Sequence, residues 1–220
     1  MIKIINATAG PITTIGRCVG GCYGSDTKDK YKNYKRGLQC IKDGHGRVLE
    51  YPDITIEIDD YSMKVMRELY THIIGVTRTQ ESTRYVNMTE RGNVIPPSIK
   101  ASEKALKLLN HHQQITALVY EDLIQLGIPK EDASCILPLS TKTKVCLKIN
   151  ARALLNMAQV RMCSRAYWEF RNLMNELKTE VSKIDDEWKI IADMMQPKCE
   201  VMGYCTESKS CGRKPCKENS

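Results

Sequence analysis

The sequence predicts an α+β fold, a mixed α/β subunit in which long helices pack on a small sheet. Residues 53–59 alternate acidic residues or Thr with Ile, which is the pattern of a half-buried strand. Other stretches carry apolar residues at helical spacing, as Val65, Met66 and Leu69 do. Strands and helices do not alternate strictly along the chain, so a parallel βαβ sheet is disfavoured.

The first elements are read from caps and glycines. We expect a short strand at 3–7, followed by a glycine-rich loop that extends to Ser25. Asp26 or Thr27 can then cap a helix that runs to about Asp43. Its apolar side is expected to contain Tyr31, Tyr34, Leu38 and Ile41.

The remaining elements follow in order. Ser62 is expected to cap a helix that carries its apolar face as far as Ile73. After Pro96 and Pro97 break the chain, a long helix is expected over 98–126, stopped by the Gly and Pro that follow. A strand at 144–149, a helix over 150–171 and a shorter helix near 185–195 complete the prediction.

Length and composition indicate a globular protein. The 220 residues suit one domain, which we place at 1–196 and follow with a Cys-rich polar tail at 197–220. No apolar run has the length of a membrane span and the N-terminus has no signal-peptide pattern, so a cytoplasmic protein is expected. The net charge of +7 suits phosphorylated or carboxylate-rich ligands, and also weak nucleic-acid binding.

Ten cysteines are many for a cytosolic chain, in which stable disulfides are not expected. Four of them lie in the tail, and their spacing is not the paired C-x-x-C of a zinc ribbon. Four thiolates could still close a tetrahedral site, which Cys18 and Cys22 could join, whereas the other interpretation is a flexible tail. We assign no metal site. The tail cysteines are Cys199, Cys205, Cys211 and Cys216.

Two segments carry residues suited to anions. Ser82 and Arg84, two positions apart in Ser-Thr-Arg-Tyr, can present a hydroxyl and a rigid guanidinium fork to a phosphate. Arg161 lies beside the apolar face of the helix predicted at 150–171, where it needs an anionic or carbonyl partner. The alternative for Arg161 is an internal ion pair with Glu169 or another acid.

Four segments in the same order resemble the flavin-dependent thymidylate synthases. Ser82 to Tyr85 is similar to the end of that family's signature, which reads Arg-His-Arg, a spacer, then Ser-x-Arg-Tyr. Residues 150–171 resemble its C-terminal helix, and His45 to Glu50 resemble its Gly-His block before a strand. The fourth match is Leu137-Pro138 before the strand at 144–149.

The sequence departs from that family at three arginines. The Arg-His-Arg positions fall on His72, Ile73 and Ile74, or, with one inserted residue, on Thr71, His72 and Ile73. A further family arginine, expected at the nucleotide phosphate, is Ser134. Fewer guanidiniums should weaken binding of flavin and nucleotide phosphates unless other cations replace them. The candidate replacements are Arg36, Arg47 and Arg78.

The resemblance implies a role for each matching residue. It places the flavin against seven side chains: His45, Glu50, His72, Arg78, Asn150, Arg152 and Asn156. It places the nucleotide at Gln80, Ser82 and Arg84, and it gives Arg161 the uracil ring as the catalytic cation. No protein nucleophile is implied, so Ser82 would hold phosphate. His111 and His112 are assigned no function.

The resemblance also implies an activity. It is the reductive methylation of dUMP to dTMP, with methylenetetrahydrofolate as carbon donor, FAD as hydride carrier and NADPH as reductant. The implied partners are these small molecules, with neither membrane nor nucleic acid, in a homotetramer whose active sites lie between subunits. Two alternatives are flavin-dependent hydroxymethylation of a pyrimidine nucleotide and a non-catalytic nucleotide- or nucleic-acid-binding protein on a decayed site.

Overall fold

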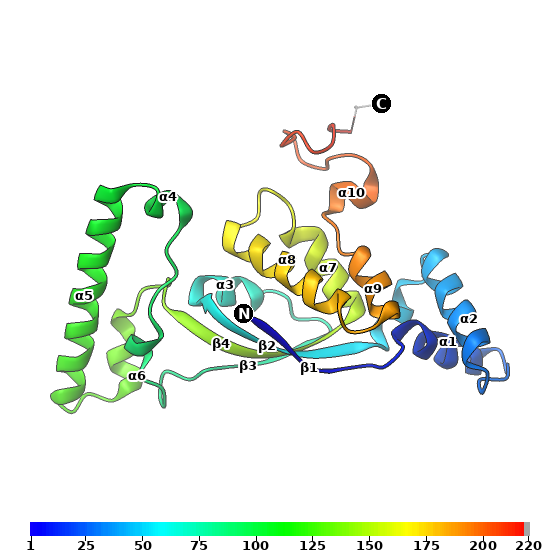
Figure 1. The fold of residues 1–220 in the computed structure, drawn as a ribbon, viewed down its shortest axis with the longest axis horizontal. Helices are drawn as coiled ribbons and strands as arrows, with labels where there is room; N and C mark the ends of the chain where they lie inside the picture. The colour runs from blue at the N-terminus through cyan, green and yellow to red at the C-terminus, as the bar shows by residue number, and fades with distance from the viewer. Residues whose placement is uncertain (218–220) are drawn as a thin grey trace. The chain divides into compact units, whose positions relative to one another are not determined.

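A computed structural model describes residues 1–217 and confirms a mixed fold of helices and one small sheet (Figure 1). None of the helices in these residues is long and apolar enough to cross a membrane. The strands are β1 (Ile2–Ala7), β2 (Asp53–Ser62), β3 (Val76–Gln80) and β4 (Lys142–Asn150). The α-helices are α1 (Pro11–Cys22), α2 (Lys30–Lys42), α3 (Met63–Leu69), α4 (Pro97–Lys100), α5 (Glu103–Gln125), α6 (Lys130–Ala133), α7 (Ala151–Arg161), α8 (Trp168–Ser182), α9 (Asp186–Asp193) and α10 (Lys198–Met202), and the 3-10 helices are η1 (Gly46–Glu50), η2 (Met88–Arg91) and η3 (Ser134–Ile136).

The four strands form one sheet in the order β1-β2-β4-β3. Along β2 every second side chain is buried, with Ile54 and Ile56 at 0% exposure, which confirms the predicted half-buried strand. Both β2 and the predicted strand β4 extend beyond the ranges expected from the sequence. Strand β3 was not expected, because Val76–Gln80 reads as polar and lies at the end of the sheet order.

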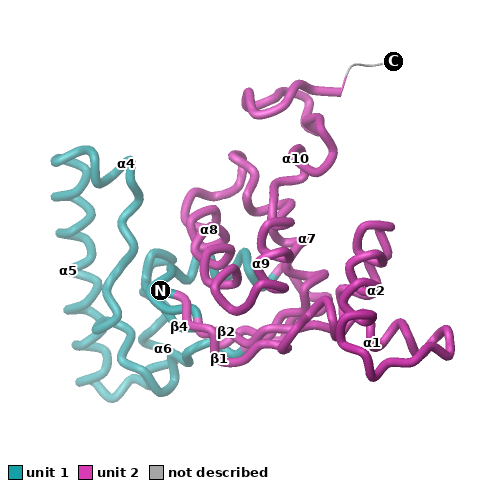
Figure 2. Tube along the Cα trace, turned by 45° about the vertical axis from the view of Figure 1, so that its right-hand side comes forward, with its two compact units in different colours: residues 1, 58–70, 79–145 teal, residues 2–57, 71–78, 146–220 magenta. Residues whose placement is uncertain are grey.

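The chain divides into two compact units, each with its own apolar interior (Figure 2). Unit 1 contains Met1, Ile58–Tyr70 and Thr79–Val145, and unit 2 contains Ile2–Glu57, Thr71–Arg78 and Cys146–Ser220. In unit 2, α8 packs against β1 and α9. The interior of unit 2 includes Leu147, Ile149, Leu154, Phe170, Leu173, Leu177 and Trp188, and that of unit 1 includes Val65, Met66, Leu69, Met88 and Tyr120.

The glycine-rich segment before Ser25 was wrongly expected to be a loop. It forms α1, which begins with Pro11 in its first turn, a position where the missing N–H costs nothing. Two of the glycines let α1 and α2 touch: a Cβ at Gly16 would lie 1.8 Å from the carbonyl oxygen of Asn33, and one at Gly37 would lie 2.0 Å from that of Ile12. The glycines therefore serve close helix contact and not chain flexibility.

Helix α2 also differs from its prediction. Its cap is Asp29, whose side chain accepts a hydrogen bond from the backbone N–H of Lys32, and not Asp26 or Thr27. The buried residues are Asn33 and Gly37. On the predicted apolar side, Tyr34, Leu38 and Ile41 are half-buried, whereas Tyr31 is 64% exposed. The most buried positions differ from the prediction because the close helix contact needs small residues at the interface.

Three helices differ in extent from their predictions. Ser62 caps α3 as predicted, but α3 stops at Leu69 and leaves Ile73 72% exposed. The long helix is interrupted between α4 and α5, where the Ser102 side chain caps a new start. The helix predicted at 150–171 breaks after α7, so Arg161 is its last residue and α8 begins at Trp168.

Candidate functional site

Hydrogen bonds of Asn150 hold the start of α7 in place within unit 2. Asn150 caps the helix with its side-chain oxygen, which accepts a hydrogen bond from the Ala153 N–H at 2.8 Å. Its own N–H donates to the carbonyl of Gly75 at 3.0 Å. Gly75 has φ +73°, and a Cβ there would come within 2.5 Å of the Asn150 amide nitrogen. Sequence reasoning missed Gly75, because the strand that follows it, β3, was not expected either.

A cavity of about 300 Å³ opens beside this cap, also in unit 2. Next to it the Arg152 guanidinium meets the Glu50 carboxylate at 2.6 Å, with both side chains nearly half exposed. The structure thus brings together three residues predicted at the flavin, Glu50, Asn150 and Arg152. An exposed ion pair of this kind stabilises the fold by at most about 1 kcal/mol, so it can rearrange around a ligand. The cavity is lined by Glu50, Asp53, Gly75, Val76, Thr77, Lys148 and Asn150.

The other end of α7 holds a second group of predicted residues. The Arg161 Nε donates to Nε2 of His72 at 3.0 Å, and its Nη2 donates to the Thr71 hydroxyl at 3.1 Å. The guanidinium also lies over the Phe170 ring, 4.8 Å from its centroid. Arg78 donates to the carbonyl of His72 at 2.8 Å. Sequence reasoning missed Phe170, although it lies within the segment 150–171 that resembles the family's C-terminal helix.

His72 is held as a neutral ring. Burial lowers the pKa of His72 first, and the nearby Arg161 and Arg78 guanidiniums lower it further because they repel a second cation. Since Nε2 accepts the hydrogen bond from Arg161, the ring proton belongs on Nδ1. A neutral His72 therefore orients the Arg161 fork without competing with it for an anion.

Two predicted flavin residues stand apart from these groups. His45 is exposed and lines another cavity of about 540 Å³ in unit 2, together with Arg47 and Tyr51. Asn156 is exposed on α7, whereas Leu154 and Met157 of the same helix are buried. A flavin role for either residue stays a prediction.

The predicted phosphate loop lies in unit 1. The Ser82 hydroxyl accepts a hydrogen bond from the backbone N–H of Arg84 at 3.2 Å, which leaves its own proton available to donate. The Arg84 Nε meets the Glu131 carboxylate at 2.5 Å, with both side chains largely exposed. Gln80 donates to the Thr143 hydroxyl at 3.3 Å. Ser82 and Arg84 are therefore adjacent, but the Arg84 fork is already engaged by an acid.

Of the three candidate replacement arginines, Arg36 serves the fold. It donates to the Gly16 carbonyl and to the Asn33 side chain, both at 2.9 Å, and so ties α2 to α1. Arg78 lies beside His72, and Arg47 lines the cavity that contains His45. Among residues 1–217 no three His, Cys, Asp or Glu side chains are placed to hold a metal ion.

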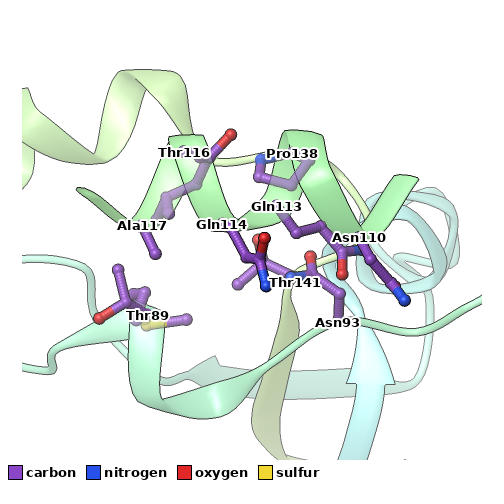
Figure 3. A pocket seen from close by; sticks show the side chains of 11 residues that line it. Thr89, Asn93, Asn110, Gln113, Gln114, Thr116, Ala117, Pro138 and Thr141 are labelled. Atoms are coloured by element: carbon purple, nitrogen blue, oxygen red, sulfur yellow. The ribbon is translucent and has the colours of Figure 1, made fainter. Parts of the chain in front are cut away.

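Unit 1 contains a separate cavity of about 370 Å³, which is lined by none of the residues predicted to bind flavin or nucleotide (Figure 3). Its walls are uncharged amides, hydroxyls and apolar groups from α5 and the loops around Asn93 and Thr141. Thr141 is 2% exposed, and its hydroxyl has no hydrogen-bond partner within the described part of the chain. This cavity is suited to water or a neutral ligand and not to an anion.

The helix-and-sheet scaffold carries arginine, amide and hydroxyl groups, which define a class of site suited to anionic ligands. The family model described as "Thymidylate synthase complementing protein" matches residues 3–185. The chain belongs to this family, that of the flavin-dependent thymidylate synthases.

Curated relatives agree with the family match. The flavin-dependent thymidylate synthase of Pyrococcus furiosus is 34% identical over 169 residues, covering 74% of this chain and 69% of that protein. The enzyme of the same name from Pyrococcus horikoshii is 32% identical over 218 residues, covering 94% of this chain and 89% of that protein.

Solved structures agree in fold. A UMP/dUMP methylase from Streptomyces cacaoi bound with 5-Br dUMP has a TM-score of 0.72 at 18% identity, covering 87% of this chain and 93% of that one. The flavin dependent thymidylate synthase of Helicobacter pylori, complexed with FAD and dUMP, has a TM-score of 0.66 at 19% identity, covering 89% and 99%. At such identities the likeness concerns the fold alone.

Proposed function

We propose that this chain is a flavin-dependent thymidylate synthase that methylates dUMP to dTMP. The observation that carries the proposal is the family match over residues 3–185, together with 34% identity to a curated enzyme of that name. The matched range includes both ends of α7 and the Ser82 loop, so every residue assigned to flavin or nucleotide lies inside it.

FAD is the proposed cofactor, and its chemistry is the acceptance and delivery of a hydride. The cavity beside Asn150 fits this assignment, because Gly75 leaves the Asn150 amide close to the backbone without a side chain in the way. The Glu50–Arg152 pair borders the same place and can exchange one partner for a ligand group. The residues proposed to hold FAD are His45, Glu50, His72, Arg78, Asn150, Arg152 and Asn156.

Arg161 is the proposed catalytic residue. A guanidinium is always protonated, so it can polarise a uracil carbonyl and stabilise the negative charge that develops as the ring is activated. Its hydrogen bonds to neutral His72 and to Thr71 fix the plane of the fork before the substrate arrives. Such preorganisation is what a side chain must supply when the cofactor carries the redox step.

In unit 1, Ser82, Arg84 and Gln80 are proposed to bind the nucleotide phosphate. This role is supported because the Ser82 hydroxyl accepts a hydrogen bond from the backbone N–H of Arg84, which leaves its O–H group able to donate to a phosphate. Arg84 would have to leave Glu131, and an exposed pair permits this at low cost. Ser82 donates a hydrogen bond in this scheme and attacks nothing.

The co-substrates proposed are methylenetetrahydrofolate as carbon donor and NADPH as reductant. We also propose a homotetramer, supported by the apolar side chains that α5 exposes, with Leu108 71% and Leu118 61% exposed. A cytoplasmic location is supported by the cysteines, all ten of which are free thiols.

An absorbance spectrum and a product assay test the proposal. The purified protein should carry, or take up in titration, a flavin whose fluorescence is quenched on binding. Incubated with FAD, NADPH, methylenetetrahydrofolate and dUMP tritiated at carbon 5, it should release tritium and form dTMP on chromatography. A hydroxymethylated product would replace the proposed reaction by the alternative one. No flavin uptake at high micromolar FAD would refute the enzyme assignment.

A further inference from the structure

The C-terminal tail and the end of α7 enclose a cavity of about 430 Å³ within unit 2. Its walls come from Arg161, from the turn that follows α7, and from the segments on both sides of α10. The family model ends at residue 185, so the tail part of this wall lies beyond the matched range. In Figure 1 this part is the segment from α10 to the end of the described chain.

Specific contacts hold the tail in place over the turn. Arg165 donates to the Lys209 carbonyl at 2.6 Å and meets the Glu207 carboxylate at 3.4 Å. Arg213 reaches back to donate to the Met162 carbonyl at 3.2 Å. Within the tail, the Cys205 N–H donates to the Pro215 carbonyl at 2.7 Å and so closes the segment on itself. These contacts fix residues 205–215 of the tail against the turn that follows α7.

The cavity has a strong excess of positive charge. Five of its lining side chains are cations, and Glu207 is the one acid among the lining residues. Glu207 and Glu200 engage two of the cations, through pairs with Arg165 and Lys214. Within the described part of the chain, Lys198 and Arg213 have no carboxylate partner. The cations are Arg161, Arg165, Lys198, Arg213 and Lys214.

We propose that this cavity, the tail pocket, binds a small ligand that carries at least two oxyanion groups, as phosphate esters or as clustered carboxylates. The guanidinium fork of Arg213 matches the geometry of both groups, and Lys198 adds a mobile point charge. The volume admits a diphosphate or a short acidic chain and excludes a folded partner. Because Arg161 forms part of the wall, a bound anion also changes the electrostatic field at the proposed catalytic cation.

The reactivity of Cys211 can report ligand binding in the tail pocket. Cys211 is an exposed thiol that lines the pocket beside Arg213. Hydrogen bonds with the Ser164 side chain and the Arg213 backbone lower the pKa of Cys211, which favours the reactive thiolate. An anion seated in the pocket should raise that pKa and cover the sulfur, so alkylation of Cys211 should slow.

The test measures binding by the full-length protein, with inorganic pyrophosphate as the phosphate probe and a triglutamate peptide as the carboxylate probe. Calorimetry gives each affinity, and peptide mapping after limited alkylation gives the rate at Cys211. Neither readout depends on methylation. The binding proposal can therefore be refuted while the proposed function is confirmed, and the proposed function can be refuted while the binding proposal is confirmed.

The variant removes the two cations without carboxylate partners, as Lys198→Gln with Arg213→Gln. The matched control removes the same charge from exposed positions of unit 1, as Arg67→Gln with Lys104→Gln. The pocket variant should lose at least about tenfold in affinity, which is the effect of a single charge-assisted hydrogen bond, while the control stays within about twofold. Circular dichroism checks that both variants fold.

Binding of either probe that is lost in the pocket variant, and that protects Cys211, supports the tail pocket and identifies the source of the anion. Two results would overturn it. One is the absence of binding by both probes at millimolar concentration and low salt. The other is an equal loss of affinity in the pocket variant and the control, which would reveal attraction by net charge alone.

Discussion

Arg161→Lys is the most direct test of how the site works. The change keeps the charge but removes the planar fork, so the hydrogen bonds to His72 at 3.0 Å and to Thr71 at 3.1 Å cannot both be kept. Lysine can keep one of these bonds, and the loss of one hydrogen bond from a charged donor costs about 1.5 to 3 kcal/mol, so the free energy of unfolding should fall by about 2 kcal/mol. For a domain of this size the midpoint temperature should fall by roughly 4 to 8 °C.

The effect on turnover should be larger than the effect on folding. Loss of one preorganised donor slows reactions by on the order of a hundredfold, and lysine cannot reproduce two donors in one plane. Tritium release from dUMP under saturating substrates measures turnover, and thermal unfolding measures stability. Arg67→Lys is the control, because Arg67 is an exposed arginine on α3.

The reasoning fails if Arg161→Lys keeps full turnover per folded molecule. It also fails if the loss of turnover follows the loss of folded protein and nothing more. In either case Arg161 would serve the fold, through His72 and Phe170, and would not act on the base.

Four further predictions address other parts of the site. Ser82→Ala should weaken dUMP binding about tenfold to a hundredfold by titration, because a hydrogen bond to a charged group is lost, with some turnover left at saturation. Glu131→Gln should tighten dUMP binding severalfold by releasing Arg84, and unchanged affinity would mean that Arg84 does not meet the phosphate. The lowered pKa of His72 means that the unfolded chain takes up this proton first, so stability should be full above about pH 6.5 and fall as the pH drops below it; urea unfolding at several pH values measures this, and His72→Gln should flatten the slope. Gly75→Ala should cost about 1 to 2 kcal/mol for its positive φ alone and should also displace Asn150, so flavin titration should weaken together with stability, and normal flavin binding would count against the Asn150 site.

Local sequence signals gave several elements correctly. The alternation of Ile over 53–59 predicted β2, Ser62 caps α3 as predicted, and α7 follows Asn150, where the sequence predicted that a helix begins. These succeed because a pleat or a cap depends on a few neighbouring residues.

The errors came from contacts between distant segments. Gly16 was placed in a loop and Gly37 at an ordinary helix position, yet both lie in the contact between α1 and α2, which no local pattern reveals. Strand β3 has no apolar alternation and exists because it pairs at the end of the sheet order.

The sequence by itself determined the family, the α+β class and the residues that could bind anions, because motifs and periodicity are local properties of the chain. Only the tertiary structure decided which of those residues meet. It joined Arg161 to His72, 89 positions apart, paired Arg152 with Glu50, and engaged Arg84 with Glu131. It also turned the tail toward the end of α7. The physical reason is that a guanidinium takes whichever acceptor the fold brings within about 3 Å, and that distance is set by burial of apolar side chains far from it in sequence.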